Sequence, residues 1–392
     1  MNQIAEQKLS QAARYLGENG IDLWLIYASE GSDPAVALLT GLKTIGRTFF
    51  FIGGDGKNRV LASVIDAQSY EESGLFDEVI QYSGDPAAQL RVELEKLPHD
   101  KIAIDFSTGD HLCDGLTTGR YRWLARTLGS EYEARFVSSE PMLSRIRAIK
   151  MPEEIAAMRR AIAIQDDIYA EVFAAIHPGM TEYQVGELFI KAMNSRGVVM
   201  SFTRDMSMPI IMKERISHRA PGEAVLTPGD YLIIDFGVLA EGYSSDFSRT
   251  LYMLKPGETK APARFEEIFR ATHGAITKAF EAARPGVEGW TVDMAAREHL
   301  RSRGMPELTH STGHQIGTYA HDGGTMFAPK WEVYGKAPYG IIEEGMVLSL
   351  EPTVFLEDEY CALTEEEILI TKDGAEFLTT RQNDIILIPA EK

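Results

Sequence analysis

The sequence predicts two domains that mix helices with strands: an α/β domain over residues 1–150 and a second domain over residues 151–392. The 392 residues of the chain exceed the usual size of one domain. Strand-like apolar runs alternate with helical patterns through the first 150 residues, which is typical of an α/β domain. Beyond residue 151, pairs of helical patterns alternate with pairs of strand patterns.

The first domain contains a helical pattern and then a series of strand patterns. Apolar side chains recur with a helical period within residues 2–19, and Asn19-Gly20 supplies a stop. Apolar and β-branched runs predict strands at residues 21–27, 48–52, 59–64, 78–82, 101–106 and 132–137, with helices at residues 87–97 and 118–128. Gly53-Gly54-Asp55-Gly56 lacks the Lys-Ser/Thr of a phosphate-binding loop, so we expect a hairpin turn there. We expect this domain to serve as a scaffold.

The second domain begins with two helices. Pro152 followed by two glutamates is a good helix start, and the helical period continues to about residue 176. A second helix is predicted over residues 181–196, with Gly197 as its C-cap. Two further helical patterns lie at residues 263–283 and 291–303. Residues 138–141 are typical of a loop, and we place the domain boundary near residue 150.

Two strand patterns between these helix pairs each deliver one carboxylate. The run at residues 231–238 carries Asp235, and a connection containing Gly242 leads to Asp246 and to a second run at residues 250–254. A buried carboxylate without a partner is costly, so two together require protons, cations or metal ions.

More acids and histidines follow in short apolar or glycine-rich segments. They are His310, His314, His321, Glu351 at the end of a strand pattern, and Glu365 at the start of another. Four carboxylates and a histidine form a hard donor set that suits Mn²⁺, with Co²⁺, Zn²⁺ and Fe²⁺ as alternatives. Two ions per chain would balance four carboxylates. Hydrolases of this kind hold two ions about 3.5–4 Å apart and use a shared water as the nucleophile.

Each of these residues also has a simpler interpretation on its own. Asp235 or Asp246 alone fits a turn or capping residue. The tripeptide Asp235-Phe-Gly matches the metal-binding tripeptide of kinases, but no glycine-rich loop or His-Arg-Asp precedes it. The acids at residues 365–367 also fit a solvated strand edge, and only one of two neighbouring strand side chains faces a given site. Their joint occurrence favours the metal site.

The motifs resemble those of the "pita-bread" metallopeptidases, family M24, which holds the Xaa-Pro dipeptidases (prolidases), aminopeptidase P, methionine aminopeptidase and creatinase. The shared motifs are an Asp-Phe-Gly, an aspartate 11 residues later, a Gly-His-x-x-Gly, a Glu-Pro and a Glu-rich strand. The resemblance covers nearly the whole chain. It implies a creatinase-type α/β domain over residues 1–150 and an α+β pita-bread catalytic domain over residues 151–392.

The resemblance also implies a set of metal ligands. They are Asp235, Asp246, His314, Glu351 and Glu365. In this family pattern Asp246 and Glu365 bridge two ions, and Asp235 completes one of them. His314 and Glu351 complete the other ion, and Glu351 also relays the proton of the bridging water.

Three histidines carry over from the same resemblance as substrate residues. His218 lies 17 residues before Asp235 and would face the substrate. His321 lies seven residues after His314 and would donate a hydrogen bond to the scissile carbonyl, where it stabilises developing negative charge. His310 would line the pocket for the proline side of the substrate.

One of the departures from the prolidase pattern concerns a contact to the substrate. Leu363 stands where prolidases usually carry an arginine near the carboxylate of the substrate. Another cation would have to replace it. The candidates are Arg204, Arg219, Lys330 and Arg381.

The composition limits the classes of binding partner and the cellular compartment that we expect. A net charge of −19 disfavours nucleic acid and anionic membranes as partners. Cys113 and Cys361 are too few for a disulfide framework, which suits a reducing compartment. The start of the sequence lacks the layout of a signal peptide, and no apolar run approaches the roughly 20 residues that span a bilayer. We therefore expect a cytoplasmic protein.

We expect the protein to hydrolyse the Xaa-Pro bond of proline-containing dipeptides or short peptides with a water that bridges two metal ions. One alternative is aminopeptidase P-like removal of the residue before proline from longer peptides. Another is a non-peptidase C–N hydrolase of the same fold, such as creatinase or ectoine hydrolase. A third is a binding module without catalysis, which the retained ligands disfavour. The resemblance further implies a homodimer.

Overall fold

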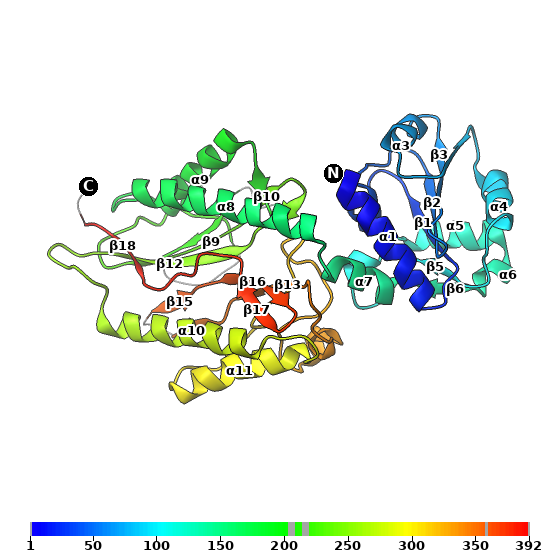
Figure 1. Ribbon diagram of the computed structural model, residues 1–392. Coiled ribbons are helices and arrows are strands. Elements are labelled where there is room, and N and C mark those ends of the chain that lie inside the picture. The colour runs from blue at the N-terminus through cyan, green and yellow to red at the C-terminus, as the bar shows by residue number, and fades with distance from the viewer. Residues whose placement is uncertain (1, 203–207, 214–218, 357–359, 391–392) are drawn as a thin grey trace. The chain divides into compact units, whose positions relative to one another are not determined.

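The computed structural model describes residues 2–202, 208–213, 219–356 and 360–390. The chain divides into two compact units, Met1–Arg147 and Ala148–Lys392 (Figure 1). Each unit has apolar clusters of its own. Among the described residues, no helix combines the length and the apolar character needed to cross a membrane.

A six-stranded mixed sheet with the order β4-β3-β2-β1-β5-β6 forms the centre of the first unit. Its strands are β1 (Leu23–Ala28), β2 (Thr48–Gly53), β3 (Asn58–Ser63), β4 (Glu78–Tyr82), β5 (Ile102–Ile104) and β6 (Phe136–Ser138). The helices are α1 (Asn2–Glu18), α2 (Pro34–Thr40), α3 (Ala67–Ser73), α4 (Ala87–Glu95), α5 (Thr118–Leu128), α6 (Ser130–Glu133) and α7 (Glu140–Ala148), with a 3₁₀ turn η1 (His111–Cys113).

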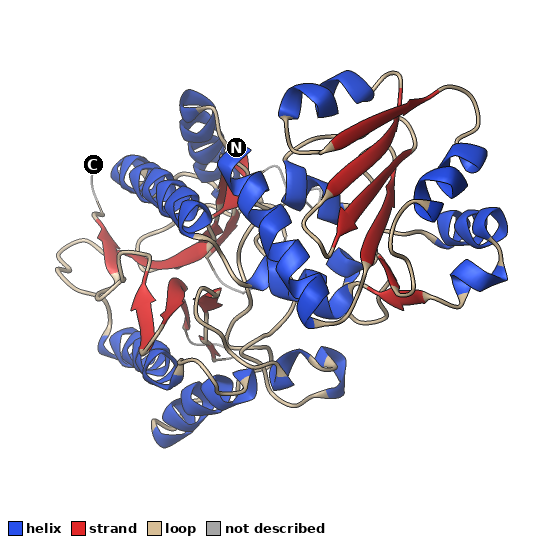
Figure 2. Cartoon of the chain, turned by 45° about the vertical axis from the view of Figure 1, so that its right-hand side comes forward, coloured by secondary structure: helices blue, strands red, loops and turns tan. Residues whose placement is uncertain are grey.

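Both faces of this sheet are covered by helices (Figure 2). Trp24 and Ile26 of β1 pack with α1, α2, α3 and α7 on one face, and the alternate residues of β1 pack with α4 and α5 on the other. Burial on both faces explains why β1 is a continuous apolar run. The glycine-rich run at residues 53–56 is the turn of the antiparallel β2–β3 pair, as predicted.

Two predictions for the first unit are wrong. The strand predicted from residue 132 begins only at Phe136, because residues 130–133 form the short helix α6. Residues 138–141 are not a plain loop, because α7 begins at Glu140. Pro141 lies in the first turn of α7, where a missing backbone N–H costs nothing.

Four helices and a set of short sheets form the second unit. The helices are α8 (Pro152–Ala175), α9 (Glu182–Arg196), α10 (Ala263–Ala282) and α11 (Gly289–Ser302), with 3₁₀ turns η2 (Glu332–Tyr334) and η3 (Ala337–Tyr339). Their bounds lie within two residues of the predicted ones. Thr181 and Gln184 form a reciprocal capping box at the start of α9, and Gly197 ends it with a φ of 66°.

The strands of this unit form four sheets, with the orders β18-β12-β9-β8, β11-β10-β7, β13-β16-β17 and β14-β15. Their bounds are β7 (Val199–Met200), β8 (Ile210–Met212), β9 (Tyr231–Phe236), β10 (Val238–Ala240), β11 (Tyr243–Ser244), β12 (Phe247–Met253), β13 (Val347–Leu350), β14 (Thr353–Phe355), β15 (Cys361–Leu363), β16 (Glu366–Thr371), β17 (Gly374–Phe377) and β18 (Ile386–Ile388). In Figure 1 the strands lie between α8 and α9 on one side and α10 and α11 on the other.

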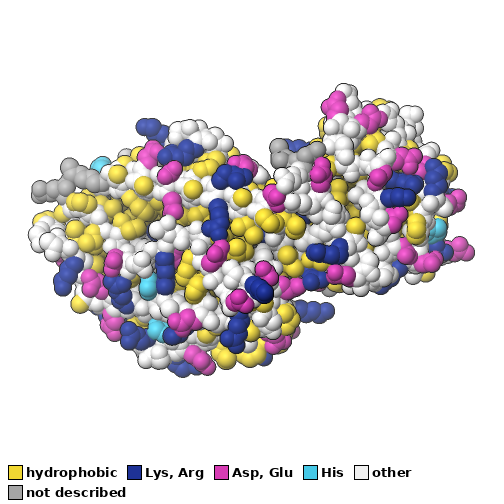
Figure 3. Space-filling view, in the orientation of Figure 1, with side chains coloured by type: hydrophobic (Ala, Val, Ile, Leu, Met, Phe, Trp, Pro, Cys, Tyr) yellow, Lys and Arg dark blue, Asp and Glu magenta, His cyan; other side chains and the backbone are white. Residues whose placement is uncertain are grey.

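The main core of the second unit lies between α10, α11 and the strands. Ala275 and Ile276 of α10 are fully buried in one cluster with Leu348 of β13 and Ile368 of β16. On the face drawn in Figure 3, Lys and Arg side chains lie among Asp and Glu side chains instead of forming one basic patch.

Candidate metal centre

The β9–β12 pair brings Asp235 and Asp246 together. The strands are antiparallel, Asp235 pairs with Ser248, and Asp246 immediately precedes β12. Gln165 of α8 bridges the pair by donating to the backbone carbonyls of Phe236 and Phe247, at 2.5 and 2.8 Å. This bridge holds the two strands in register where they carry the aspartates.

A second antiparallel pair, β13–β16, supplies the two glutamates. Leu350 and Glu366 form the last pair at one end of this ladder. Glu351 follows Leu350 and Glu365 precedes Glu366, so both glutamates lie just beyond the same end of the ladder. The Glu365 amide donates to the carbonyl oxygen of Ser248 at 3.3 Å. The two strand pairs are therefore joined at the point where all four carboxylates leave them.

His314 reaches the carboxylates because its segment runs beside the end of β13. Its carbonyl accepts from the Ser349 amide at 2.8 Å, and the Glu351 amide donates to the Thr312 carbonyl at 2.8 Å. As a result His314 Nε2 lies 3.4 Å from Glu351 Oε1 and 3.9 Å from Asp246 Oδ2. His314 Nδ1 faces the carbonyl of Gln315 at 3.2 Å, an arrangement that leaves Nε2 of the neutral ring as the metal-facing atom.

The five predicted ligands converge in this region. Asp235, Asp246 and Glu365 form one group, and His314, Glu351 and Glu365 form another, with the ligand atoms of each group within 4.8 Å of one another. Glu365 belongs to both groups. Carboxylate oxygens with one imidazole nitrogen suit divalent ions such as Mn²⁺, Co²⁺ or Zn²⁺, so the residues fit a metal site.

Burial makes the cluster electrostatically unfavourable without cations. Burial, and then the nearby Asp235 carboxylate, raise the pKa of Glu351 to about 8. Burial, and then the neighbouring acids, raise the pKa of Asp246 and the pKa of Glu365 well above the usual values for these residue types. Burial lowers the pKa of His314 well below its usual value, which keeps the imidazole neutral and able to ligate.

The three histidines predicted to contact substrate have different positions. The exposed His321 lies next to His314, with ring centroids 4.2 Å apart, and forms a third group with Asp246 and His314. His310 is half-buried and is not a member of the groups found among the described residues; its Nδ1 lies 2.7 Å from the Ser311 carbonyl oxygen. His218 lies outside the described residues.

The described candidates for replacing the missing arginine are engaged by other groups. Leu363 itself is buried in the core cluster. Arg219 forms an ion pair with the buried Glu182 at 2.8 Å. Lys330 Nζ lies 3.5 Å from the centre of the Trp290 ring. Arg381 donates to the backbone carbonyl of His273 and to Thr277, and Arg204 lies outside the described residues.

Three charged residues around the cluster were not predicted as part of it. Glu366 and Glu367 are fully buried, so the interpretation of residues 365–367 as a solvated edge is wrong. Glu367 accepts from the Asp246 amide at 2.8 Å. Arg249 donates to the carbonyls of Ser248 and Glu365, each at 2.9 Å. An arginine three residues after Asp246 was the one available sequence signal.

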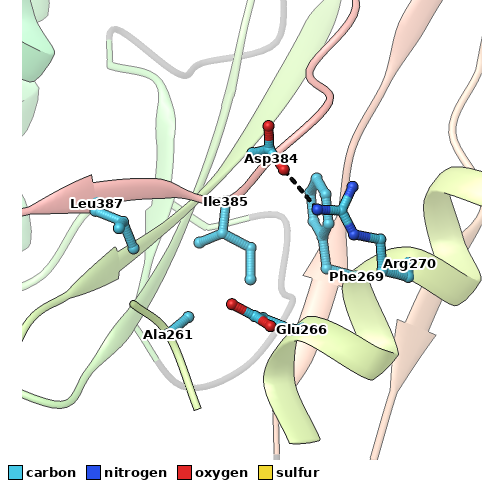
Figure 4. A pocket seen from close by; sticks show the side chains of 7 residues that line it. All are labelled: Ala261, Glu266, Phe269, Arg270, Asp384, Ile385 and Leu387. Carbon is cyan, nitrogen blue, oxygen red and sulfur yellow. Dashed lines mark hydrogen bonds and ion pairs between the residues drawn. The ribbon is translucent and has the colours of Figure 1, made fainter. Parts of the chain in front are cut away.

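A cavity lies between α10 and the segment that contains β18, and no residue of the carboxylate cluster lines it. It is lined by Ala261, Glu266, Phe269, Arg270, Asp384, Ile385 and Leu387. Figure 4 shows the Glu266 carboxylate directed between Ala261 and Ile385, while Arg270 and Asp384 form an ion pair at its edge. A single such carboxylate beside apolar side chains does not make a metal site, and none of the predicted site residues lies here.

Comparison with known proteins identifies similar sequences and folds. Residues 156–372 match the description "Metallopeptidase family M24". The chain is 28% identical over 281 residues to the Xaa-Pro dipeptidase of Lactobacillus helveticus, covering 70% of this chain and 71% of that protein. It is 23% identical over 391 residues to the Xaa-Pro dipeptidase of Pyrococcus furiosus, covering 97% of this chain and all (100%) of that protein.

A solved structure shares the fold over almost the entire chain. The X-Pro aminopeptidase of Thermotoga maritima superposes with a TM-score of 0.77 at 23% identity, covering 97% of this chain and 99% of that one. The predicted fold class, a creatinase-type α/β domain followed by an α+β pita-bread domain, is confirmed.

Proposed function

This chain belongs to metallopeptidase family M24, and on that premise we propose that it hydrolyses the Xaa-Pro bond of short peptides at the cluster around Glu365. The observation that carries the proposal is the convergence of Asp235, Asp246 and His314 with the two glutamates. Two divalent ions per chain, with Mn²⁺ as the first candidate and Co²⁺, Zn²⁺ and Fe²⁺ as alternatives, would lower the pKa of a water and polarise the scissile carbonyl.

The side chains of this site would transfer the proton, stabilise the oxyanion and contact the substrate. Glu351 is half-buried and adjoins His314, so it is placed to take the proton of the attacking water and deliver it to the leaving nitrogen. His321 is exposed beside His314, where its N–H can stabilise the oxyanion that develops on the substrate. We keep His218 and His310 as substrate-contacting residues on the strength of the family resemblance.

The uncharged side chain of Leu363 favours longer peptides over dipeptides. A free dipeptide brings its carboxylate close to the metal centre, and Leu363 offers no charge there. Arg219 is engaged by Glu182 and Lys330 stacks on Trp290. We therefore favour the aminopeptidase P-like variant, in which the amide after proline replaces the carboxylate.

Substrate screening separates these activities. Metal-free protein reloaded with Mn²⁺, Co²⁺, Zn²⁺ or Fe²⁺ should be assayed with Ala-Pro, Ala-Pro-amide, Ala-Pro-Ala, creatine and ectoine. We expect kcat/KM to be at least as high for Ala-Pro-Ala and Ala-Pro-amide as for Ala-Pro. Turnover of creatine or ectoine alone would instead establish a non-peptidase hydrolase.

Two variants test the chemistry itself. Glu351→Gln should lower kcat by about 10²–10⁴-fold because the general base is lost. Asp373→Asn, a change of an exposed acid in the turn after β16, is the matched control and should leave kcat unchanged. Full Xaa-Pro activity in Asp246→Ala, or in protein freed of metal, would refute the metal mechanism.

We also propose that the protein is a cytoplasmic homodimer that acts on peptides and binds neither nucleic acid nor membranes. Light scattering of the purified chain tests the assembly, and a mass near twice 43.5 kDa is expected. A monomeric mass at assay concentration would show that the site is complete in one chain.

A further inference from the structure

A buried ion pair lies beneath the segment that carries two histidines of the site. Lys150 Nζ and Asp322 Oδ2 are 3.3 Å apart, and each side chain is only 1% exposed. Asp322 directly follows His321 in the sequence. The two side chains are neighbours in the sequence, but that of Asp322 is buried and that of His321 is exposed to solvent.

Lys150 is fixed to the strand that ends at Glu351. Its amide donates to the Gly345 carbonyl at 2.9 Å, and Ile149 forms a β-bridge with Met346. These residues immediately precede β13. The ammonium group of Lys150 is therefore anchored to the β13 side of the metal cluster.

Asp322 closes the loop that runs from His314 to His321. Its amide donates to the Gln315 carbonyl at 2.8 Å, so the two ends of the loop meet. Its Oδ1 accepts from the Tyr319 amide and from Thr318, each at 3.4 Å. With Oδ2 held by Lys150, both oxygens of this carboxylate fix the loop.

Gly317 shows how closely the loop fits over the ion pair. A Cβ atom there would lie 2.2 Å from Asp322 Oδ2 and 3.0 Å from Lys150 Cε. The Gly317 carbonyl also accepts from the Ser244 amide at 2.7 Å, two residues before Asp246. One loop thus contacts the segments that lead to Asp246 and to Glu351.

A buried ion pair is a poor source of stability, because apolar side chains of similar size often stabilise a fold as well or better. Its value lies in geometry, since removing either partner changes where the other can sit. We propose that Lys150 and Asp322 are positioning residues that hold His321 beside His314 for the Xaa-Pro hydrolysis proposed above, on which this inference rests. Both side chains are buried, so the proposed role is exerted through the loop and not by contact with substrate.

The test compares Lys150→Met, Asp322→Asn and the double variant. Each single variant removes the tether and leaves one group buried without its ion-pair partner, so urea unfolding should show a loss of stability. The double variant carries no buried charge at these two positions and should regain much of that stability while the tether stays absent. Metal content of the double variant, measured after reloading, should match the wild type.

The kinetic expectation is a loss of kcat without a matching change in KM. Misplacement of a reacting group by about 1 Å lowers the rate by about 100-fold, so we expect kcat of the double variant to fall between about 10- and 100-fold. Because either substitution removes the same tether, the double variant should be no slower than the slower single variant. A double variant with restored stability and wild-type kcat would overturn the proposal.

A second readout does not depend on hydrolysis. In the Zn²⁺-loaded protein, the imidazole resonances of His321 should shift or broaden in the double variant, while those of His273 on α10 should not move. If the wild type fails to cleave Xaa-Pro peptides but His321 still responds, the proposed function is wrong and the positioning role stands. An unchanged His321 resonance overturns the positioning role.

The matched control is an ion pair of the same unit that lies in solvent. Arg160 and Glu241 are 2.6 Å apart with side chains 51% and 57% exposed. The double variant Arg160→Met and Glu241→Gln should keep the wild-type kcat and the wild-type His321 resonance. A loss of kcat there equal to that of the buried pair would also count against the proposal.

Discussion

Gly237 and Ser245 lie so close that a Cβ atom on Gly237 would stand 2.1 Å from the backbone carbonyl oxygen of Ser245. Gly237 follows Asp235 by two residues, and Ser245 immediately precedes Asp246. The contact therefore sets how near the two aspartates approach each other. Glycine in the Asp-Phe-Gly motif is a packing requirement of the carboxylate cluster.

Gly237→Ala should weaken metal binding by separating Asp235 from Asp246. Overpacking of this kind costs about 1–3 kcal/mol, and we expect at least a tenfold rise in the Kd for Mn²⁺, measured by calorimetry. Gly374→Ala is the matched control, because a Cβ atom there meets nothing within 4 Å. A wild-type Kd in Gly237→Ala would show that the backbone adjusts without moving the aspartates.

Metal affinity should rise with pH up to about pH 8. Burial first, and then the Asp235 carboxylate, raise the pKa of Glu351 from 4.5 to about 8. A bound ion requires the carboxylate form, so binding below pH 8 releases a proton. Calorimetry at pH 6, 7 and 8 in two buffers with different ionisation enthalpies should detect that proton, and no difference between the buffers at pH 6 would contradict the prediction.

The same shift predicts the stability of the metal-free protein. The folded pKa of Glu351 lies above its unfolded value, so its contribution to stability is complete below about pH 4.5 and is lost as the pH rises to about 8. Urea midpoints of metal-free protein should fall over that range. In Glu351→Gln the fall should be smaller, and an equally steep fall would assign it to other groups.

Arg249→Lys should weaken metal binding even though the positive charge is kept. Arg249 donates to the backbone of Ser248 and Glu365, and it also reaches the Thr380 carbonyl at 2.8 Å. A lysine has no planar fork with which to make these contacts together. We expect about a tenfold higher Kd for Mn²⁺, whereas Arg160→Lys at the exposed ion pair should leave the Kd unchanged. Equal Kd values for both variants would remove Arg249 from the metal site.

The sequence predicts the five residues that converge better than it predicts their surroundings, because local signals mark those five. Asp235 lies in a strand before glycine and Glu351 ends a strand before proline, so each carries its own structural context. Glu366 and Glu367 have no such mark, and three adjacent glutamates are usually exposed. Their burial depends on Arg249 and on the Asp246 amide, which are contacts that only the tertiary fold creates.

The fold shows the same division between local and tertiary control. The long helix α8 begins at Pro152, as its proline and acidic residues predict. The sequence predicts a loop at the start of α7, because Ser-Ser-Glu-Pro fits a turn as well as a helix start. Ser139 settles the choice through a contact that sequence does not reveal, since its hydroxyl donates to the buried Asp105.

Asp105 and Asp33 form a carboxyl pair within the first unit. Both are buried, and Asp105 Oδ1 accepts a hydrogen bond from Trp24 Nε1 at 2.5 Å. Burial raises the pKa of Asp33 from 3.8 to about 6, against the opposing hydrogen bonds from Ala35 and Asp105. Burial, and then the charge of Asp33, raise the pKa of Asp105 well above its usual value. We therefore expect the two carboxyl groups to share one proton.

Loss of that proton should make the first unit less stable as the pH rises. The folded pKa of Asp33 lies above its unfolded value, so the stabilisation is complete below about pH 3.8 and is lost toward about pH 6. The loss from Asp33 amounts to about 3 kcal/mol. Asp105→Asn should reduce this loss of stability with pH, because the amide donates to Asp33 at every pH while its oxygen still accepts from Trp24.

Hydrogen exchange in β1 and β5 of the full-length protein, corrected for intrinsic rates, measures the pH dependence of stability. The exposed Asp100→Asn is the control, and a wild-type pH slope in Asp105→Asn would show that the pair shares no proton.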